Sequence, residues 1–392
     1  MSNSKKTPRD ISLSGKRVLV RCDFNVPMKD GVIQDERRIA SALPTIRYLL
    51  DNGAAVTLCS HMGRPKGEVN PKYSLAPVAE CLSRLLGQEV KLASDVIGES
   101  AKAVRAGCKP GQAVLIENVR YDAREEKNDP EFARALAEGA DLYVNDAFGA
   151  AHRAHASTEG VSKYLPAYCG FLMEREVQVL GDALSAPKRP FTAVLGGSKI
   201  ADKLALIDNL LPKCDNVLIV GGMAYTFQKA LGGQIGTSIC DDSKLDTLRE
   251  LMAKAEGKIH LPADSVVADS FSNDANFKTV KAGCIPEGWE GMDIGEETAK
   301  AYAEIIKNSG TVVWNGPAGV FEMSNFSRGT RAIAEAMAET KAFTIIGGGD
   351  SASAIEVLGL ADKIDHISTG GGASLEFLEG KTLPGVACLE DK

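Results

Sequence analysis

The sequence T-I-I-G-G-G-D-S-A-S, residues 344–353, is the stretch from which we interpret the fold. It begins with a short β-rich run, continues with three glycines that allow a sharp turn, and offers Asp350 or Ser351 as the N-cap of a following helix. The free N–H groups of such a helix start suit a phosphate, and Asp350 is the kind of oxygen ligand that Mg²⁺ takes. An ordinary strand-to-helix turn explains the same residues, so other stretches must decide between the two interpretations.

The same local pattern recurs along the chain: a β-rich run is followed by glycine, a charged residue or asparagine, and then by a helical stretch. Continuous apolar strands that alternate with helices predict an α/β fold, in which parallel sheets are covered on both faces. Ligands of such sheets bind beyond the carboxyl ends of the strands. The expected strands are residues 17–22, 54–60, 113–117, 141–145, 191–195, 216–220, 311–314 and 341–346.

Length and composition narrow the class of protein. A chain of 392 residues exceeds what one hydrophobic core usually serves, so we expect two domains. Its 45 Lys and Arg against 52 Asp and Glu give a net charge of −7, which argues against a nucleic-acid-binding or anionic-membrane surface. Residues 1–14 lack the apolar core of a secretion signal and no stretch stays apolar long enough to span a bilayer, so we expect a cytoplasmic protein. Nine cysteines without a C-x-x-C pair indicate reduced thiols.

Polar side chains follow the first two expected strands. Asp23 and Asn25 point the same way where the first strand ends and suit a hydroxyl or an acid, although an Asx turn explains them equally well. His61 and Arg64 flank Gly63 after the second strand, where they form a fork for a phosphate or carboxylate. This pattern predicts an anion site at one edge of the first sheet.

Four arginines lie beyond or near strand ends in this half of an acidic chain. Each one alone is explained as a solvated surface residue, but together they indicate a site for a ligand with more than one negative charge. An acidic small molecule fits this pattern better than a nucleic acid. The H-x-x-H pair at 152–155 lacks a third ligand of suitable spacing, which argues against zinc. The four arginines are Arg38, Arg64, Arg120 and Arg153.

The second half repeats the rhythm after an apolar helical stripe at residues 173–184 and the sequence P-K-R-P at 187–190, which we interpret as a connecting helix and a linker. Lys199 and Lys203 follow Gly196-Gly197-Ser198 with the i, i+4 spacing of one helix face, so we expect them to share the start of a helix. A solvated helix face is the alternative. Glu322 is a candidate for ribose hydroxyls. The G-x-x-x-x-G-K-[ST] and G-x-G-x-x-G fingerprints and the protein-kinase motifs are absent.

Seven motifs in chain order closely resemble the phosphoglycerate kinase family, and the resemblance covers essentially the whole chain. The chain looks like a member of the family with the length of the bacterial proteins. The motifs are V-L-V-R-C-D-F-N-V-P (18–27), S-H-M-G-R-P (60–65), A-H-R-A-H-A-S-T (151–158), G-G-S-K-I-A-D-K (196–203), W-N-G-P-A-G-V-F-E (314–322), G-G-G-D-S (347–351) and S-T-G-G-G-A-S-L-E (368–376).

The resemblance implies two Rossmann-like domains, each a parallel sheet flanked by helices, joined by a hinge helix. Residues 1–171 would bind phosphoglycerate, residues 172–186 would form the hinge helix, and residues 187–370 would bind the nucleotide. The last segment, from about 371 to 392, would cross back onto the first domain. The implied reaction is reversible phosphoryl transfer between 1,3-bisphosphoglycerate and Mg-ADP, giving 3-phosphoglycerate and Mg-ATP, in a glycolytic enzyme that is a monomer.

The resemblance also implies which residues form each site. Arg38 and Lys199 would be catalytic, and Asp350 would lie on the magnesium side. The substrate-binding residues would be Asp23, Phe24, Asn25, Arg38, His61, Met62, Gly63, Arg64, Arg120 and Arg153. The nucleotide-binding residues would be Gly197, Lys199, Lys203, Gly221, Asn315, Glu322, Gly347, Gly348, Gly349, Asp350 and Ser351.

The implied chemistry explains the dense cations. A carboxylic acid has a pKa near ~4, so the carboxylate that attacks ATP is already deprotonated and no general base is needed. Positioning and charge neutralisation remain, and we expect Lys199 and Arg38 to supply them. Two alternatives are a catalytically silent scaffold on the same fold, which would be expected to lack one of Arg38, Lys199 or Asp350, and a nicotinamide-dependent dehydrogenase, which the missing dinucleotide fingerprint disfavours.

Overall fold

The computed structural model describes residues 4–392, and the chain divides into two compact units. The first unit contains the residues up to Val179 together with Thr382–Lys392, and the second contains Leu180–Lys381. We expected the returning C-terminal segment from about residue 371. It begins at Thr382 because α12 (Gly372–Leu378) groups with the second unit. Within residues 4–392, no helix has the length and apolar character that crossing a membrane requires.

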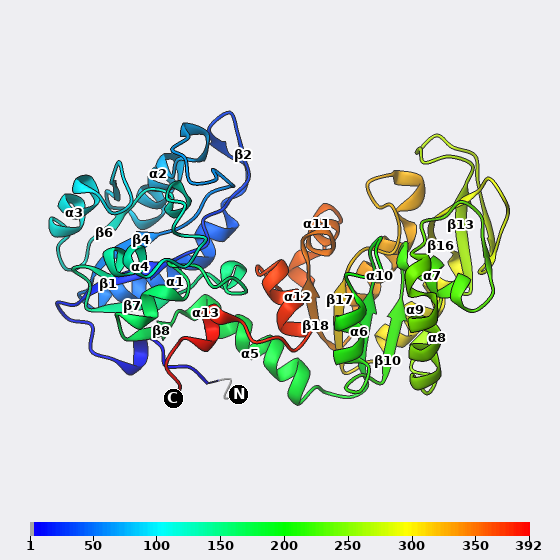
Figure 1. Cartoon of the computed structure of the whole chain (residues 1–392). Coiled ribbons are helices and arrows are strands. Elements are labelled where there is room, and N and C mark those ends of the chain that lie inside the picture. The colour runs from blue at the N-terminus through cyan, green and yellow to red at the C-terminus, as the bar shows by residue number, and fades with distance from the viewer. Residues whose placement is uncertain (1–3) are drawn as a thin grey trace. The chain divides into compact units, whose positions relative to one another are not determined.

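The first unit is built on a six-stranded parallel sheet with the order β5-β6-β4-β1-β7-β8 (Figure 1). The central strand β1 is almost wholly buried, which suits its apolar run. The strands are β1 (Arg17–Arg21), β4 (Ala55–Cys59), β5 (Lys91–Leu92), β6 (Ala113–Leu115), β7 (Leu142–Asn145) and β8 (Ala167–Cys169), and the flanking helices are α1 (Arg37–Asp51), α2 (Ala76–Leu86), α3 (Glu99–Ala106) and α4 (Pro130–Ala137).

Helix α1 shows why these segments fold as they do. Its buried side chains, which include Ile39, Ala42, Ile46 and Leu49, recur every three or four residues and so form one apolar stripe. They belong to the same hydrophobic core as the buried residues of β1 and β4. The stripe therefore fixes α1 against the sheet and leaves its polar residues, among them Arg38, outside that core.

The second unit contains another six-stranded parallel sheet, with the order β12-β10-β9-β17-β18-β19. All eight expected strands are therefore present, four in each sheet. The strands are β9 (Phe191–Leu195), β10 (Asn216–Ile219), β12 (Ile259–His260), β17 (Thr311–Asn315), β18 (Phe343–Gly347) and β19 (His366–Ile367). The helices are α6 (Leu204–Leu210), α7 (Met223–Ala230), α8 (Leu245–Lys254), α9 (Glu296–Lys307), α10 (Arg328–Glu339), α11 (Gly349–Val357) and α12.

The second unit also has a smaller antiparallel sheet that the sequence did not lead us to expect. Its strands are β13 (Asp264–Ala268), β14 (Phe277–Lys281) and β16 (Glu290–Ile294), in the order β14-β13-β16. Most of β14 is exposed, so its sequence F-K-T-V-K lacks the continuous apolar run by which we recognised the other strands. Two further two-stranded ladders pair β2 (Met28–Lys29) with β3 (Val32–Ile33) and β11 (Gln234–Ile235) with β15 (Cys284–Ile285).

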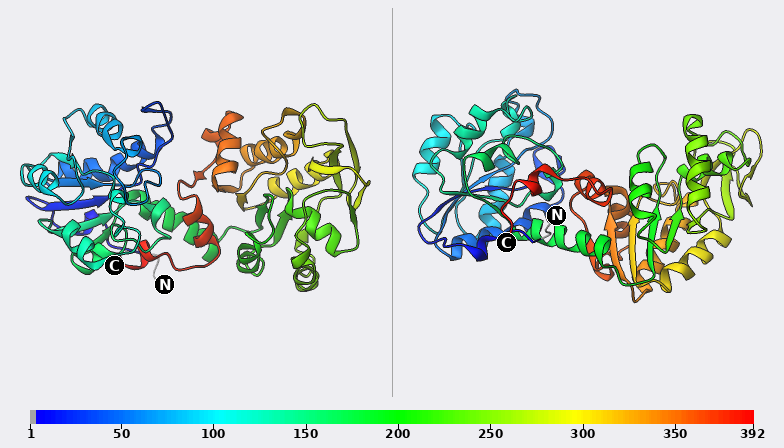
Figure 2. Two further views of the ribbon diagram at one scale, coloured as in Figure 1. Left: turned by 45° about the horizontal axis from the view of Figure 1, so that its top comes forward. Right: turned by 60° about the horizontal axis from the view of Figure 1, so that its bottom comes forward.

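Helix α5 (Phe171–Ser185) contains the boundary between the units, and the C-terminal segment rejoins the first unit through α13 (Pro384–Ala387). Residues 390–392 run beside residues 4–6, as both views of Figure 2 show. The Lys6 N–H donates to the Glu390 carbonyl at 2.8 Å, and the Glu390 N–H donates to the Ala167 carbonyl at 2.9 Å. The two ends of the described chain thus extend the hydrogen bonding at the β8 edge of the sheet.

Candidate active site

The carboxyl ends of the central strands in the first unit bring distant segments together. Strand β1 is paired with β4 on one side and with β7 on the other, so that Arg21 aligns with both Cys59 and Asn145. The segments that follow these strands therefore meet at one edge of the sheet. These are the segments in which the sequence predicted an anion site.

Arg38 is held by acceptors that follow β1. Its Nη1 atom lies 3.1 Å from Oδ2 of Asp23 and 3.1 Å from the carbonyl oxygen of Asn25. The Asn25 side chain in turn accepts a hydrogen bond of 2.9 Å from the N–H of Gly63. Asp23 also accepts from the Asn25 N–H at 3.2 Å, so the Asx turn and the contact with Arg38 occur together.

His61 is a buried neutral imidazole surrounded by arginines. His61 is only 3 % exposed, and its Nδ1 atom is 3.2 Å from Nη2 of Arg21. Burial, and then the positive charges of Arg21, Arg120, Arg153 and Arg38, hold its pKa well below the usual value. His61 therefore offers hydrogen bonds here without carrying a charge.

Arg120 is buried beneath the same edge. Its Nη1 atom donates to the Gly63 carbonyl at 2.8 Å, and burial, reinforced by Arg153, lowers its pKa to about 10. Gly63 adopts φ 58°, and a Cβ atom there would lie 2.4 Å from the Tyr73 ring, so glycine is required. Arg64 is exposed and Arg153 half-buried, and neither guanidinium has a carboxylate partner within residues 4–392. The cluster thus has positive charge available for an anion.

Phe24 and Met62 occupy this edge differently from the polar residues. Both side chains belong to the hydrophobic core of the first unit. Their backbone N–H groups are fixed by Ser60 Oγ at 2.9 Å and by Asn118 Oδ1 at 3.1 Å, respectively. They therefore shape the backbone of the site, and their side chains face the core.

Sequence reasoning missed Arg21, which lies behind His61. Its residue is 1 % exposed, and its Nε atom donates to Ser157 Oγ at 2.8 Å. It lies within the first expected strand, where we assigned it no role. A fully buried arginine is rare without a partner, but burial is not visible in the sequence, so no signal there distinguished Arg21 from its neighbours.

The second unit contains a cavity of ≈ 350 Å³ at the carboxyl edge of its parallel sheet. Strand β17 lies between β9 and β18, so the turns after these three strands meet there. Its wall is rich in glycine, which lets backbone approach a ligand closely. The lining is Gly196, Gly197, Ser198, Lys199, Asp202, Lys203, Asn315, Gly316, Pro317, Gly348, Gly349, Asp350, Ser351, Gly371, Gly372 and Leu375.

The two lysines of this cavity differ in environment. Lys203 is partly buried and donates from Nζ to Oδ1 of Asn315, and burial lowers its pKa. Lys199 is exposed and makes neither a hydrogen bond nor an ion pair with the residues that the structure describes. Our expectation that they share a helix face is wrong, because α6 begins only at Leu204. Both lie in the irregular turn that follows Gly197, whose φ is 115°.

The glycine turn after β18 also begins its helix differently from our prediction. Gly348, with φ 94°, is the N-cap of α11, so the expectation that Asp350 or Ser351 caps the helix is wrong. The φ of Gly348 lies where only glycine is unstrained, and this lets the helix start directly at the strand end. Asp350 lies in the first helical turn, and Ser351 Oγ accepts from the Gly316 N–H at 2.7 Å.

Three expected nucleotide residues do not line the cavity. Gly347 is the last residue of β18. Gly221 supports the wall, because a Cβ atom at this position would lie 2.7 Å from the Gly197 nitrogen. Glu322 is exposed in a turn beyond β17. Conversely, Gly371, Gly372 and Leu375 at the start of α12 line the cavity although we did not select them. They lie in the S-T-G-G-G-A-S-L-E motif, so the motif itself was a usable signal.

The acidic residues of the cavity fit a metal that arrives with a phosphate ligand. Asp202 and Asp350 are in the lining, and no group of three metal-ligating side chains occurs anywhere in the described chain. Mg²⁺ commonly binds through one or two carboxylates together with substrate phosphates. The residues present therefore suit Mg²⁺ carried by a nucleotide, and they do not form a separate metal cage.

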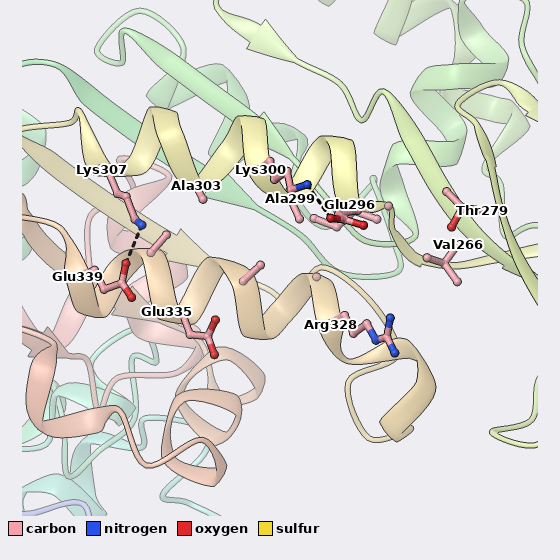
Figure 3. A pocket seen from close by; sticks show the side chains of 15 residues that line it. Val266, Thr279, Glu296, Ala299, Lys300, Ala303, Lys307, Arg328, Glu335 and Glu339 are labelled. Atoms are coloured by element: carbon pink, nitrogen blue, oxygen red, sulfur yellow. Dashed lines mark ion pairs between the residues drawn. The ribbon is translucent and has the colours of Figure 1, made fainter.

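A larger cavity of ≈ 440 Å³ lies between α9 and α10, away from the motif residues (Figure 3). Lys300 pairs with Glu296 at 2.6 Å and Lys307 with Glu339 at 2.6 Å, so much of its charge is neutralised internally. Between these pairs its wall includes Ala299 and Ala303. Arg328 is a further cation of this lining, but none of the glycines or lysines of the sequence motifs is in it, so we place the candidate site in the smaller cavity.

An arginine cluster on one α/β unit and a glycine-lined cavity with an unpaired lysine on the other define the class of protein. Both are positioned to bind anions, and neither contains a titratable base beside a nucleophile. Phosphoryl transfer depends on this kind of positioning and charge stabilisation. The fold and its sites are therefore those of a phosphotransferase.

Comparison with known proteins identifies the family. A family model described as phosphoglycerate kinase matches residues 9–381. The chain is 56 % identical over 397 residues to the phosphoglycerate kinase of Clostridium botulinum strain Alaska E43, with 100 % of both chains covered. It is also 56 % identical over 398 residues to that of Clostridium perfringens strain SM101, again with 100 % of both covered.

Solved structures agree. The structure of phosphoglycerate kinase from Coxiella burnetii matches with a TM-score of 0.91 and 43 % identity over 98 % of each chain. That of phosphoglycerate kinase from Pyrococcus horikoshii OT3 matches with a TM-score of 0.84 and 33 % identity over 98 % of each chain. The chain belongs to the phosphoglycerate kinase family. It is a kinase of glycolysis, which moves a phosphoryl group reversibly between 1,3-bisphosphoglycerate and ADP, and nothing in these comparisons supports the alternative of a silent scaffold.

Proposed function

We propose that the phosphoryl group passes directly, in line, between a phosphoglycerate held by the first unit and Mg-ADP held by the second. The observation that carries this proposal is the neutral His61 among Arg21, Arg38, Arg120 and Arg153. An uncharged imidazole within a cationic cluster is suited to hold an anion, and the low pKa keeps it from acting as an acid at neutral pH.

The phosphoglycerate site in this proposal is the edge of the first sheet. Arg64, Arg120 and Arg153 provide the positive charge that a phosphate and a carboxyl group require, and His61 donates a neutral hydrogen bond. Asn25 orients the loop at Gly63, to which it is bonded at 2.9 Å. Asp23 orients Arg38, and the Arg38 side chain, which is 38 % exposed, remains accessible to the reacting acyl group.

The nucleotide site in this proposal is the glycine-lined cavity. Lys203, anchored on Asn315, contacts a phosphate of the nucleotide. The first turn of α11, from Gly349, offers N–H groups to the phosphate chain. Lys199 has no protein partner within residues 4–392, and it follows the charge of the transferred phosphoryl group. Glu322 and Gly221 lie outside the cavity lining, and we retain them as candidate contacts to the nucleoside.

Magnesium would be held by Asp350 together with the phosphates of the nucleotide. When bound, it neutralises phosphate charge and stabilises the oxygens between which the phosphoryl group moves. The remaining steps belong to side chains. The phosphoglycerate carboxylate is ionised at neutral pH because its pKa is near ~4, so Arg38 orients it and no residue must remove a proton. Lys199 and Arg38 then stabilise charge on the equatorial oxygens.

The proposal requires the ligands of the two units to meet during turnover. We propose that bending about α5, within which the boundary of the units falls, brings them together and excludes water from the acyl phosphate. We further propose that the enzyme acts as a monomer in the cytoplasm.

A coupled assay tests this function directly. Purified protein is mixed with 1,3-bisphosphoglycerate, ADP and Mg²⁺, and ATP formation is followed with a luciferase readout. We expect ATP to form in proportion to protein and to require both substrates. Folded protein that forms no ATP would contradict the proposal. A Lys199→Ala variant with the same circular dichroism spectrum provides the matched control for contaminating kinases.

A further inference from the structure

A series of buried polar groups connects His61 to Glu125, a residue that has no role in the proposed reaction. Glu125 is fully buried, and it accepts hydrogen bonds from the N–H of Ser157 at 2.9 Å and from Ser157 Oγ at 2.5 Å. Ser157 Oγ in turn accepts from Nε of Arg21 at 2.8 Å. Arg21 then contacts His61 through Nη2. Three consecutive contacts therefore join a buried carboxylate to the imidazole.

The direction of each hydrogen bond in this chain is determined by chemistry. A guanidinium has only donors, so Nδ1 of His61 must be the acceptor from Arg21. A neutral imidazole that accepts at Nδ1 carries its hydrogen on Nε2. Ser157 has one hydroxyl hydrogen, which it donates to Glu125, and this leaves its oxygen to accept from Arg21. The whole chain consequently specifies one tautomer of one histidine.

All three guanidinium nitrogens of Arg21 make hydrogen bonds in this arrangement. Its residue is 1 % exposed, and its third nitrogen, Nη1, donates to the Cys22 carbonyl at 2.5 Å. Glu125 supplies the negative charge that a buried guanidinium needs, and the positive charge of Arg21 in turn lowers the pKa that burial of Glu125 raises. Nε2 of His61, by contrast, has no acceptor within residues 4–392. It is the free donor of the set.

We infer that Glu125, Ser157 and Arg21 are positioning residues that hold His61 as its Nε2–H tautomer, so that it presents a neutral hydrogen-bond donor to the acidic substrate. The identity of that substrate rests on the function proposed above. The tautomer follows from the protein contacts alone. In the alternative Nδ1–H tautomer, two donors would face each other at 3.2 Å, and a substrate oxygen would meet a lone pair.

The tautomer is measured by long-range ¹H–¹⁵N correlation spectra of protein labelled with ¹⁵N-histidine. The chain has five histidines, and a His61→Gln variant identifies the His61 signals by their loss. We expect His61 to show an unprotonated Nδ1 and a protonated Nε2 from pH 6 to pH 8, without added substrate. Signals of an Nδ1–H tautomer, of a mixture, or of an imidazolium at pH 6 would overturn the inference.

Kinetics test whether the chain reaches the substrate. Ser157→Ala removes one hydroxyl between Glu125 and Arg21, and Ser83→Ala is its matched control. Ser83 likewise donates one hydrogen bond and accepts one, to the Ala79 carbonyl at 2.7 Å and from the Val90 N–H at 2.9 Å, but it lies in α2 away from the cluster. We expect Ser157→Ala to raise KM for 3-phosphoglycerate about three- to tenfold and to leave KM for ATP unchanged. We expect Ser83→Ala to change neither constant.

A second variant guards against a purely structural effect. Glu125→Gln keeps the size of the side chain but places an amide donor beside a Ser157 donor, so it should raise the same KM and produce a mixture of His61 tautomers. Equal KM values for Ser157→Ala and Ser83→Ala, or an unchanged His61 tautomer in Glu125→Gln, would refute the positioning chain. Absence of kinase activity in a wild-type protein that shows the expected tautomer would instead refute the proposed function and leave the tautomer assignment intact.

Discussion

Nη1 of Arg38 lies 3.1 Å from Oδ2 of Asp23, yet the Arg38 side chain is still 38 % exposed. An ion pair this exposed contributes little to stability because solvent screens it. Its effect is on orientation, since Asp23 and the Asn25 carbonyl fix one edge of the guanidinium and leave the rest free. This relationship is consistent with the catalytic role that we propose for Arg38, and the first prediction tests that role.

Arg38→Ala should lower kcat by about 10²–10³, the range observed when one preorganised donor to a transition state is removed. ADP affinity, measured by isothermal titration calorimetry, and the melting temperature should stay near the wild-type values. Arg37→Ala is the matched control, because Arg37 is the preceding residue of α1 and pairs with Asp35 at 2.6 Å. Near-normal turnover of Arg38→Ala would remove Arg38 from the mechanism.

Alanine substitutions of the two lysines of the cavity should affect different kinetic and binding constants. Lys199 has no protein partner within residues 4–392, so Lys199→Ala should lower kcat by orders of magnitude and change ADP affinity little. Lys203 is anchored on Asn315, so Lys203→Ala should mainly weaken ADP binding. Steady-state kinetics combined with calorimetry separate the two effects. The same pattern of loss in both variants would contradict their separate assignments.

Asp350→Ala should raise the Mg²⁺ concentration needed for half-maximal activity, because Asp350 is the proposed protein ligand of the nucleotide-bound metal. The measurement is a magnesium titration of initial rates at fixed ATP. Asp362→Ala, which alters an exposed acid elsewhere in the second unit, provides the control. Identical magnesium curves for both variants would exclude Asp350 as a ligand.

Asp293 should make stability depend on pH. It is buried in β16, and burial raises its pKa from 3.8 to about 7 although it accepts from the Gly329 N–H at 2.8 Å. Between these two values the native state holds a proton that the unfolded state has lost, so this contribution is present at low pH and is lost as pH rises through 7. From pH 5 to pH 8 the loss is about 3 kcal/mol.

The matched variant for this prediction is Asp293→Asn, which cannot ionise. Urea unfolding at pH 5 and pH 8 should give a free-energy difference between wild type and variant that changes by ~3 kcal/mol across the two conditions. A difference that is independent of pH would show that Asp293 has an ordinary pKa in the folded protein.

The strands and the two sites were predictable where the sequence itself encodes the reason. Apolar β-rich runs identified eight of the twelve strands in the two six-stranded sheets and missed the short strands β5, β8, β12 and β19. The rule that ligands gather at the carboxyl edge of parallel strands led us to group Asp23, His61 and Arg120. Gly348 and Lys203 were found by the same reasoning, although the helix starts near them were assigned wrongly. Helix starts depend on backbone angles, such as the φ of 94° at Gly348, which composition does not reveal.

Other features could be recognised only in the three-dimensional structure. The β14 strand is mostly exposed, so it carries no apolar run. Arg21 lies more than a hundred residues before Glu125 in the sequence, and only the fold brings both of them to Ser157. Nothing in the local sequence indicates that Arg21 or Glu125 is buried. The cavity contribution of α12 likewise depends on how the sheet brings Gly371 beside the turns of β9 and β18. Burial and long-range contact decide all three.

The hydrogen bonds between residues 4–6 and 390–392 join segments at opposite ends of the described chain, so they can form only late in its synthesis. Asn145 Nδ2 donates to the Gly385 carbonyl at 3.0 Å, and Glu390 bonds to both Lys6 and Ala167, so the first unit needs the final segment to satisfy its own buried groups. A ribosome has by then translated the whole second unit. The first unit therefore gains these contacts last, although Lys6, which accepts from the Cys169 N–H at 2.8 Å, is present at the β8 edge from the start.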